Sequence, residues 1–267
     1  MKFQNSAIQE LKIIGLNATV LFKISKDKFI DIQCDNSDVQ IKEVNQSIII
    51  SDKDTVISSS GNIRKNSINI YSNNGRVVIN SNNINNCIMV GNNIIMNKNI
   101  DAKSKKMPKT TLTIQAPFDQ IRHLDLAIVG ICCMDGISKR LIIDASISTS
   151  LDISNINKVS LSSSGNVHAL LKNIKNLKLD TSGQSYIDIQ NIEELTIDAS
   201  GQSEIDVKSD TIMEAEVDVS GMGSIQIETQ TIESLEADLS GMSMLNVFEN
   251  VLKKHIDASG MSHCKIG

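Results

Sequence analysis

The chain has 267 residues, with 26 Lys and Arg against 31 Asp and Glu, and a formal net charge of −5. That length suffices for one large or two modest domains, and 40% apolar with 21% charged residues is typical of a folded rather than a disordered protein. The acidic balance argues against nucleic acid as the main partner, because no basic face is available to neutralise phosphates.

The composition also indicates the fold class and the state of the cysteines. The chain has no Trp, 2 Tyr and 5 Phe, and a core of β-branched aliphatic side chains favours a β-rich protein. No apolar run reaches the roughly 18 residues of a membrane helix, and Met1–Asn5 lacks the apolar segment of a secretory signal. The 5 cysteines lack C-x-x-C spacing, which predicts free thiols rather than disulfides or zinc. Cys132 and Cys133 should face opposite ways on a strand, leaving at least one in the core.

The first hundred residues contain short apolar runs of strand length and no helical period. Gly, Asn, Asp or Ser bounds each run, and examples are Val20–Ile24, Phe29–Ile32, Ile48–Ile50 and Ile68–Tyr71. The polar, basic stretch Asp101–Lys109 then predicts a solvated connection. We therefore expect a β-rich N-terminal part over residues 1–109 and a repeat domain over residues 110–267.

A Ser-Gly pair recurs in the second part at steps of 18, 18, 20, 20 and 19 residues. Its copies are Ser164-Gly165, Ser182-Gly183, Ser200-Gly201, Ser220-Gly221, Ser240-Gly241 and Ser259-Gly260. Degenerate copies are expected at Ser146-Ile147 and Val129-Gly130. We expect the glycine to allow positive φ at a tight corner, and the serine hydroxyls to form hydrogen bonds from one copy to the next.

Apolar residues alternate with polar ones on both sides of each Ser-Gly pair. Leu177 and Leu179 share a face opposite Asp180, and Ile187 and Ile189 share the inward face after the turn. A third apolar position closes each copy. One copy cannot bury three apolar positions alone, whereas stacked copies can. The repeat predicts an all-β fold, a parallel β-helix (solenoid) of about 18–20 residues per rung, with some eight rungs spaced by roughly 4.8 Å.

The order of these segments resembles that of the bacterial head GIN domain family, a domain of unknown function described as a "putative auto-transporter adhesin". The resemblance covers nearly the whole chain: the opening run Ile8–Ser51, the segment Thr111–Pro117 followed by Leu124–Gly130, and S-G-x-S turns such as Ser182–Ser185. It implies an exported protein of the cell surface or periplasm, with a β-helical fold and no established catalytic residues. The turns depart from the family where small residues are common, at Gln184, Gln202, Met222, Met242 and Met261.

A ladder of outward-facing aspartates is the first candidate site. Its members occupy the same position of successive copies: Asp180, Asp198, Asp218, Asp238 and Asp257. Hydrated carboxylates one rung apart repel by roughly 0.8 kcal/mol, so the repetition calls for a compensating contact. Turn amides and serine hydroxyls could provide it through hydrogen bonds. Alternatively, the ladder could bind divalent cations, or two carboxyls roughly 6.5–9.5 Å apart could act as an inverting glycosidase pair.

A methionine stripe is the second candidate. Met222, Met242 and Met261 follow the Ser-Gly pair in three consecutive rungs. An exposed stripe would suit a partner protein, whereas an inward one would only pack the corner. The histidines are scattered, with His168 and His263 in different rungs, so neither a metal site nor a Ser-His-Asp triad is predicted.

These features favour a non-enzymatic, envelope-associated binding or structural module of adhesin type. Its ligand would be a glycan or a protein that meets the aspartate ladder or the methionine stripe. A polysaccharide-active enzyme with two ladder aspartates is one alternative, and a self-assembling scaffold is another. No cofactor is predicted. The last rung shows no polar cap, so end-to-end pairing into a homo-oligomer is a further hypothesis.

Overall fold

The computed structural model describes residues 1–4, 6–53 and 109–267 with their side chains, except that of Glu249. Between residues 53 and 109 it describes the backbone of five short strands: β6 (Arg64–Lys65), β7 (Ile68–Asn73), β8 (Arg76–Asn80), β9 (Cys87–Val90) and β10 (Asn93–Met96). Strand accounts for 77% of the structure, and the described residues form no helix. No helix in these ranges is therefore long and apolar enough to cross a membrane.

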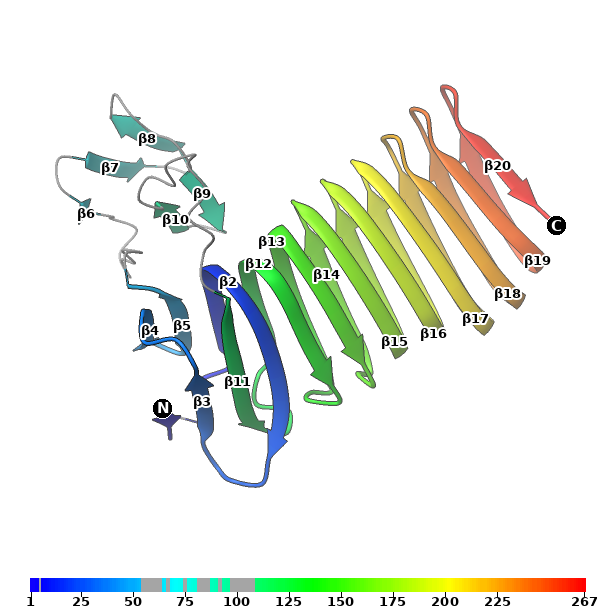
Figure 1. Cartoon of the computed structure of the whole chain (residues 1–267). Coiled ribbons are helices and arrows are strands. Elements are labelled where there is room, and N and C mark those ends of the chain that lie inside the picture. Colours follow the sequence, from blue (N-terminus) through cyan, green and yellow to red (C-terminus); the bar gives the residue numbers. More distant parts are fainter. Residues whose placement is uncertain are drawn as a thin grey trace.

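The strands stack side by side into a rod, which Figure 1 shows from β2 to β20. Each strand pairs with its neighbours along the rod, and all these pairs are parallel. The series is β2 (Glu10–Ser25), β12 (His123–Asp135), β13 (Arg140–Ser154), β14 (Lys158–Ser163), β15 (Asn166–Thr181), β16 (Gln184–Ala199), β17 (Gln202–Val219), β18 (Ser224–Leu239), β19 (Met244–Ala258) and β20 (His263–Ile266). The rod is a β-solenoid of about 8 turns, which confirms the predicted architecture.

Strands from both sides of residue 109 belong to this one sheet. β2 pairs in parallel with β12 and so forms the first rung. The remaining strands at this end are β1 (Lys2–Phe3), β3 (Ile30–Cys34), β4 (Val39–Val44), β5 (Ser47–Asp52) and β11 (Thr110–Pro117). β5 and β11 pair in parallel with β2, whereas β3 and β4 run antiparallel to β11 and β5. One continuous apolar core extends from Ile13 in β2 to Val247 in β19.

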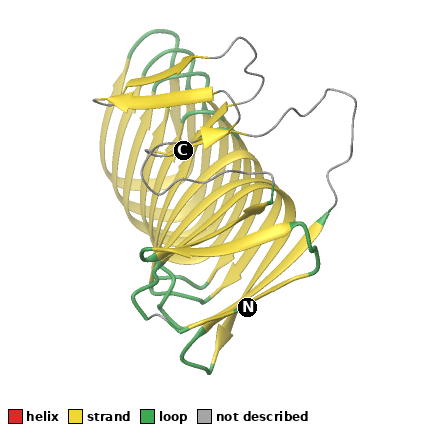
Figure 2. Ribbon diagram, turned by 90° about the vertical axis from the view of Figure 1, so that its left-hand side faces the viewer, coloured by secondary structure: helices red, strands yellow, loops and turns green. Residues whose placement is uncertain are grey.

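The core consists of columns of aliphatic side chains that repeat from rung to rung. One inward column pairs in register and is buried from Leu161 to Ala237. Its members are Leu161, Leu179, Ile197, Val217 and Ala237. In Figure 2, which views the rod from the β2 end, the strands curve around this interior. The alternation in the sequence therefore assigns the inward and outward faces correctly.

The glycines at the Ser-Gly corners lie close to the preceding rung. A Cβ added to Gly183 would lie 2.2 Å from the carbonyl oxygen of Gly165, a backbone atom. Gly241 has a φ of 77°, but the φ of Gly183 is not positive. The expected need for positive φ is therefore correct at Gly241 and wrong at Gly183, where the close approach of two rungs excludes a side chain. As expected, the Ser200 hydroxyl reaches the preceding rung, 3.3 Å from the carbonyl oxygen of Thr181.

Asparagines form the opposite corner in three consecutive rungs. Asn155, Asn173 and Asn191 have φ values of 57°, 54° and 59°, in the left-handed region that Asn tolerates better than most residues. Their side chains form a ladder, since the amides of Asn173 and Asn191 each donate a 2.9 Å hydrogen bond to the preceding asparagine. Asn155 in turn donates to Asp135 at 2.6 Å. This ladder ties neighbouring rungs together outside the core.

One of the two degenerate Ser-Gly copies is misplaced in the sequence analysis. Ser146-Ile147 does occupy the corner, with a positive φ of 70° at Ile147. In the preceding rung, however, Ala127-Ile128 and not Val129-Gly130 lies opposite this pair. The corrected register places Asp125 opposite Asp144 and so adds Asp125 to the aspartate column.

The cysteines with described side chains are free, as the sequence predicts. They are Cys34, Cys132, Cys133 and Cys264, whereas Cys87 lies outside the residues whose side chains are described. Cys132 is fully buried and Cys133 is half-buried, which confirms that this pair faces opposite ways.

Candidate functional site

The predicted aspartate ladder forms a single column on the surface of the rod. Its five members pair in register and are all exposed: Asp180, Asp198, Asp218, Asp238 and Asp257. Toward the N-terminal end the same column continues through Ser162, Asp144, Asp125 and Lys12. The structure therefore brings the predicted residues together and extends their column by four rungs.

The described residues do not make the hydrogen bonds that were expected to compensate the charges of the ladder. Among the described residues, no hydrogen bond joins Asp180, Asp198, Asp218 or Asp238 to a turn amide or a serine hydroxyl, because the corner serines contact backbone carbonyls instead. Partial burial, together with the charges of Asp198 and Asp238, raises the pKa of Asp218. Across the described part of the chain, no group of three or more His, Cys, Asp or Glu side chains is arranged to hold a metal ion. The ladder is thus a solvated row of mutually repelling charges.

The methionine stripe is exposed rather than packed into the corner. Met222, Met242 and Met261 have exposed fractions of 48%, 52% and 75%. Their backbone amides donate to glycine carbonyls of the preceding rungs, so the three residues occupy equivalent positions. The stripe follows the Ser-Gly corner along the chain, whereas the aspartate ladder precedes it. The two predicted sites are therefore separate surfaces on either side of one corner.

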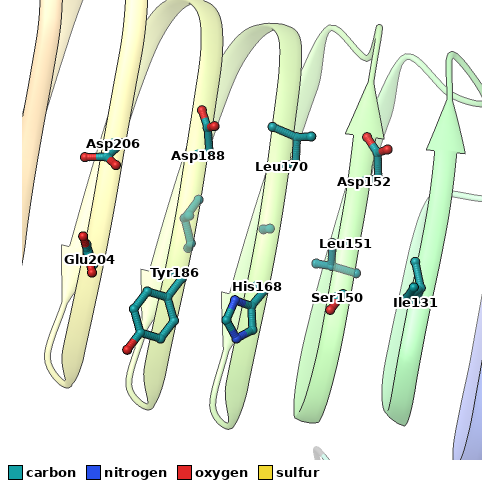
Figure 3. A pocket seen from close by; sticks show the side chains of 12 residues that line it. Ile131, Ser150, Leu151, Asp152, His168, Leu170, Tyr186, Asp188, Glu204 and Asp206 are labelled. Carbon is teal, nitrogen blue, oxygen red and sulfur yellow. The ribbon is translucent and has the colours of Figure 1, made fainter.

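A groove of about 480 Å³ lies on the wall that follows the Ser-Gly corner, toward the middle of the rod (Figure 3). Two parallel rows of outward side chains line it. The row nearer the corner is Ile131, Ser150, His168, Tyr186 and Glu204, and the second row is Asp152, Leu170, Asp188 and Asp206. Neither the aspartate ladder nor the methionine stripe contributes to this groove.

An aromatic pair forms the centre of the first row. His168 in β15 and Tyr186 in β16 pair in register, with ring centroids 4.9 Å apart and ring planes within 12° of parallel. Tyr186 is 50% exposed, and in Figure 3 both rings turn a face toward the viewer. Neither of the two predicted sites includes this pair. The available signal was their separation of 18 residues, one repeat, which places them in adjacent rungs.

Carboxylates surround the aromatic pair. Asp188 and Asp206 are half-buried, while Asp152 and Glu204 are exposed. The Gln190 amide lies 3.3 Å from both carboxylate oxygens of Asp188 and so orients this side chain. Among the described residues that line the groove, none is Lys or Arg. The groove therefore combines a flat aromatic surface with an excess of negative charge.

A cluster of charged residues lies at the N-terminal end of the aspartate column, outside the groove. Lys12 Nζ is 3.2 Å from Glu10 Oε1 and 3.8 Å from Asp125 Oδ2. His123 contacts both Glu10 and Asp144. Asp125 is 4% exposed, and its Oδ1 has no hydrogen-bond partner within the described structure. Burial raises the pKa of Asp125 to about 6. The cluster joins β2, β12 and β13.

Comparisons with known proteins agree with this architecture. A family model described as "Putative auto-transporter adhesin, head GIN domain" matches residues 92–266. A crystal structure of a "putative adhesin" from Parabacteroides merdae has 14% identity and a TM-score of 0.58, and one from Parabacteroides distasonis has 13% identity and a TM-score of 0.59. Each alignment covers 100% of this chain and 95% of the other, and at such identities the likeness concerns the fold. A comparison with curated proteins gives no match. The family match spans well over half of the sequence, and the chain belongs to the head GIN domain family.

Proposed function

We propose that this protein is a non-enzymatic, surface-associated binding module of adhesin type, and that it holds a carbohydrate in the groove on the rod. The observation that carries the proposal is the exposed pair of His168 and Tyr186 with carboxylates beside it. The description of the family as an adhesin supports a role in binding at the cell envelope. A rigid solenoid suits this role because its side chains keep their spacing without a ligand.

The groove offers the two kinds of contact that a sugar ring needs. The C–H face of a pyranose is apolar and packs against flat aromatic rings, while its hydroxyls require hydrogen-bond acceptors at the rim. Tyr186 and His168 would supply the flat surface, and the Asp188 and Asp206 carboxylates would accept from hydroxyls. Leu170 lies between Asp152 and Asp188 and adds apolar contact.

The enzyme alternative has less support from the geometry. General acid catalysis requires one carboxyl whose environment differs from that of its partner. In the ladder, Asp198, Asp218 and Asp238 are all exposed and each has an aspartate on both sides. The pKa of Asp218 is raised, but by partial burial and by these same neighbours, not by a distinct catalytic partner. Incubation with labelled polysaccharides followed by product analysis tests this alternative, and turnover that Asp198→Asn abolishes would establish it.

The methionine stripe is a proposed surface for a second protein molecule. Flexible, polarizable side chains suit adaptable protein contacts, and Met222, Met242 and Met261 are all exposed. This surface also supports the scaffold alternative, in which copies of the chain associate. Light scattering at high concentration tests it: Met242→Gln should reduce association, and a monomeric wild type would contradict it.

Two measurements test the main proposal. The first is protease accessibility of the native protein on intact source cells compared with lysed cells, where protection until lysis would contradict surface display. The second is binding to a glycan array, in which Tyr186→Ala should abolish any signal. Phe248→Ala is the matched control, because Phe248 is an exposed aromatic residue of the rod outside the groove. Equal loss in both variants would contradict binding at the groove.

A further inference from the structure

The charges around the aromatic pair restrict which sugar the groove can take. Four carboxylates line it, those of Asp152, Asp188, Glu204 and Asp206. A ligand that carries a carboxylate or sulfate would be repelled by all four, while a ligand that carries an ammonium group would be attracted. Electrostatic complementarity of this kind contributes specificity as well as affinity.

Three of these carboxylates lie on one side of the Tyr186 ring. Asp188 is two residues from Tyr186 on the same strand, and Glu204 and Asp206 pair with Tyr186 and Asp188 in the next rung. Figure 3 shows Asp206 and Asp188 in one row, beside Glu204 and Tyr186 in the other. Neighbouring strands are about 4.8 Å apart. A single ammonium group above this corner of the groove could therefore approach more than one carboxylate.

Among the described residues, no ion pair joins a lysine to Asp188, Glu204 or Asp206. Lys172 and Lys208 lie two residues beyond Leu170 and Asp206 along their strands, outside the lining of the groove. Lys208 Nζ already pairs with Glu228 of the following rung, at 3.3 Å. The negative charge of Asp188, Glu204 and Asp206 is therefore left for a ligand.

We infer that the groove binds a saccharide with a free amino group, a hexosamine unit whose ring lies on His168 and Tyr186 and whose ammonium group meets Asp188, Glu204 and Asp206. This inference rests on the proposed function, since it names the ligand class of the same groove. Hydrogen bonds between an ammonium and a carboxylate are stronger than those between a hydroxyl and a carboxylate. The aromatic pair therefore provides affinity for sugar rings in general, and the contact between the amino group and the carboxylates provides selectivity for an amino sugar.

Two oligosaccharides that differ only in acetylation provide the test. Glucosamine tetramer carries free amines, and N-acetylglucosamine tetramer carries neutral amides on the same backbone. Titration calorimetry of the full chain at about pH 6, where the amines are protonated, should give at least about tenfold tighter binding of the glucosamine tetramer. Added salt should reduce this preference, because it screens exposed charges.

Two variants locate the effect. Asp188→Asn and Glu204→Gln should remove most of the preference for the free amine while leaving weak binding of the acetylated tetramer. Asp238→Asn is the matched control, because it removes one carboxylate from the ladder on the other side of the Ser-Gly corner and leaves the groove intact. Circular dichroism of each variant establishes that the rod is folded before binding is compared.

The outcomes separate this inference from the proposed function. Equal binding of the two tetramers, or tighter binding of the acetylated one, overturns the amino-sugar inference and leaves carbohydrate binding standing. Equally tight binding of tetralysine overturns it as well, since charge alone would then be recognised. If neither tetramer binds and a broad glycan array also gives no signal dependent on Tyr186, both proposals fail.

Discussion

The imidazole Nε2 of His123 lies 2.7 Å from the carboxylate Oδ2 of Asp144 in the next rung of the rod. The other ring nitrogen, Nδ1, lies 3.0 Å from Glu10 Oε1 in the preceding rung. One ring thus bridges three consecutive strands, β2, β12 and β13. The hydrogen bond with Asp144 raises the pKa of His123, although burial opposes it. The contact therefore connects the first rung to the rest of the rod and makes that connection sensitive to pH.

The stability of the rod should fall as the pH rises from about 5 to about 8. The raised pKa of His123 means that its protonated form favours the folded state, a contribution that is lost as the pH rises through that pKa. Asp125 acts in the same direction but at lower pH, because burial raises its pKa from 3.8 to about 6. Its ionisation lowers the stability by on the order of 2–3 kcal/mol, and this loss falls between about pH 4 and pH 6. Urea denaturation at several pH values measures the free energy of unfolding.

Variants assign this pH dependence to the cluster. Asp125→Asn should flatten the part of the profile between about pH 4 and pH 6, and His123→Gln should flatten the part above it. On the acidic side the trend should reverse. Although burial opposes the shift, Ser47 and Lys12 lower the pKa of Glu10, so its contribution is present above its ordinary pKa and is lost as the pH falls. A wild-type profile that rises from pH 5 to 8 would contradict the assignment.

Gly183→Ala should destabilise the rod severely. The new Cβ would lie 2.2 Å from the carbonyl oxygen of Gly165, a backbone atom that already accepts a 2.9 Å hydrogen bond from the amide of Gln184. We expect a loss of about 2–3 kcal/mol or more, measured by thermal or urea denaturation. Ser182→Ala at the neighbouring corner residue is the control, since it removes only an exposed hydroxyl that lies 3.4 Å from the carbonyl oxygen of Ser163. Similar stability of the two variants would disprove the close approach of the rungs.

Asn173→Ala should cost about 1–2 kcal/mol, because it removes both hydrogen bonds of the asparagine ladder and leaves an alanine at a φ of 54°. Asn173→Gly removes the same hydrogen bonds but tolerates positive φ, so it should cost less. The difference between the two, measured by denaturation, isolates the backbone contribution. If glycine is the more damaging substitution, the corner does not depend on the left-handed conformation.

Asp218→Asn should leave the stability unchanged or raise it by roughly 0.2–0.5 kcal/mol. The substitution removes repulsion from Asp198 and Asp238, the two charged neighbours that help to raise the pKa of Asp218. Asp257→Asn should gain less, because Asp257 has one ladder neighbour and lies 3.5 Å from His255. The melting temperature at low and high salt measures both effects. A marked loss of stability in Asp218→Asn would instead support the alternative in which the aspartates stabilise the turns through hydrogen bonds.

The sequence by itself determined the repeating part of this protein. Ser-Gly pairs at steps of 18 to 20 residues bring successive copies into register, since parallel strands place equivalent residues side by side. From that register follow the buried column through Leu179 and Ile197 and the exposed column through Asp180 and Asp198. The same rule also places His168 beside Tyr186, because the two residues are 18 positions apart, the length of one repeat.

Only the tertiary structure shows how the N-terminal strand β2 joins the repeating part of the rod. β2 enters the sheet beside β12, more than a hundred residues later in the chain, with a register shift between Ala127 and Ile128. The spacing of residues along the chain does not predict this pairing, because β2 and β12 are not copies of one sequence repeat. That pairing buries Asp125 and brings Lys12 to Asp125 and Glu10 to His123. The rod therefore follows from local repetition, whereas its charged first rung depends on contacts between distant segments that only folding brings together.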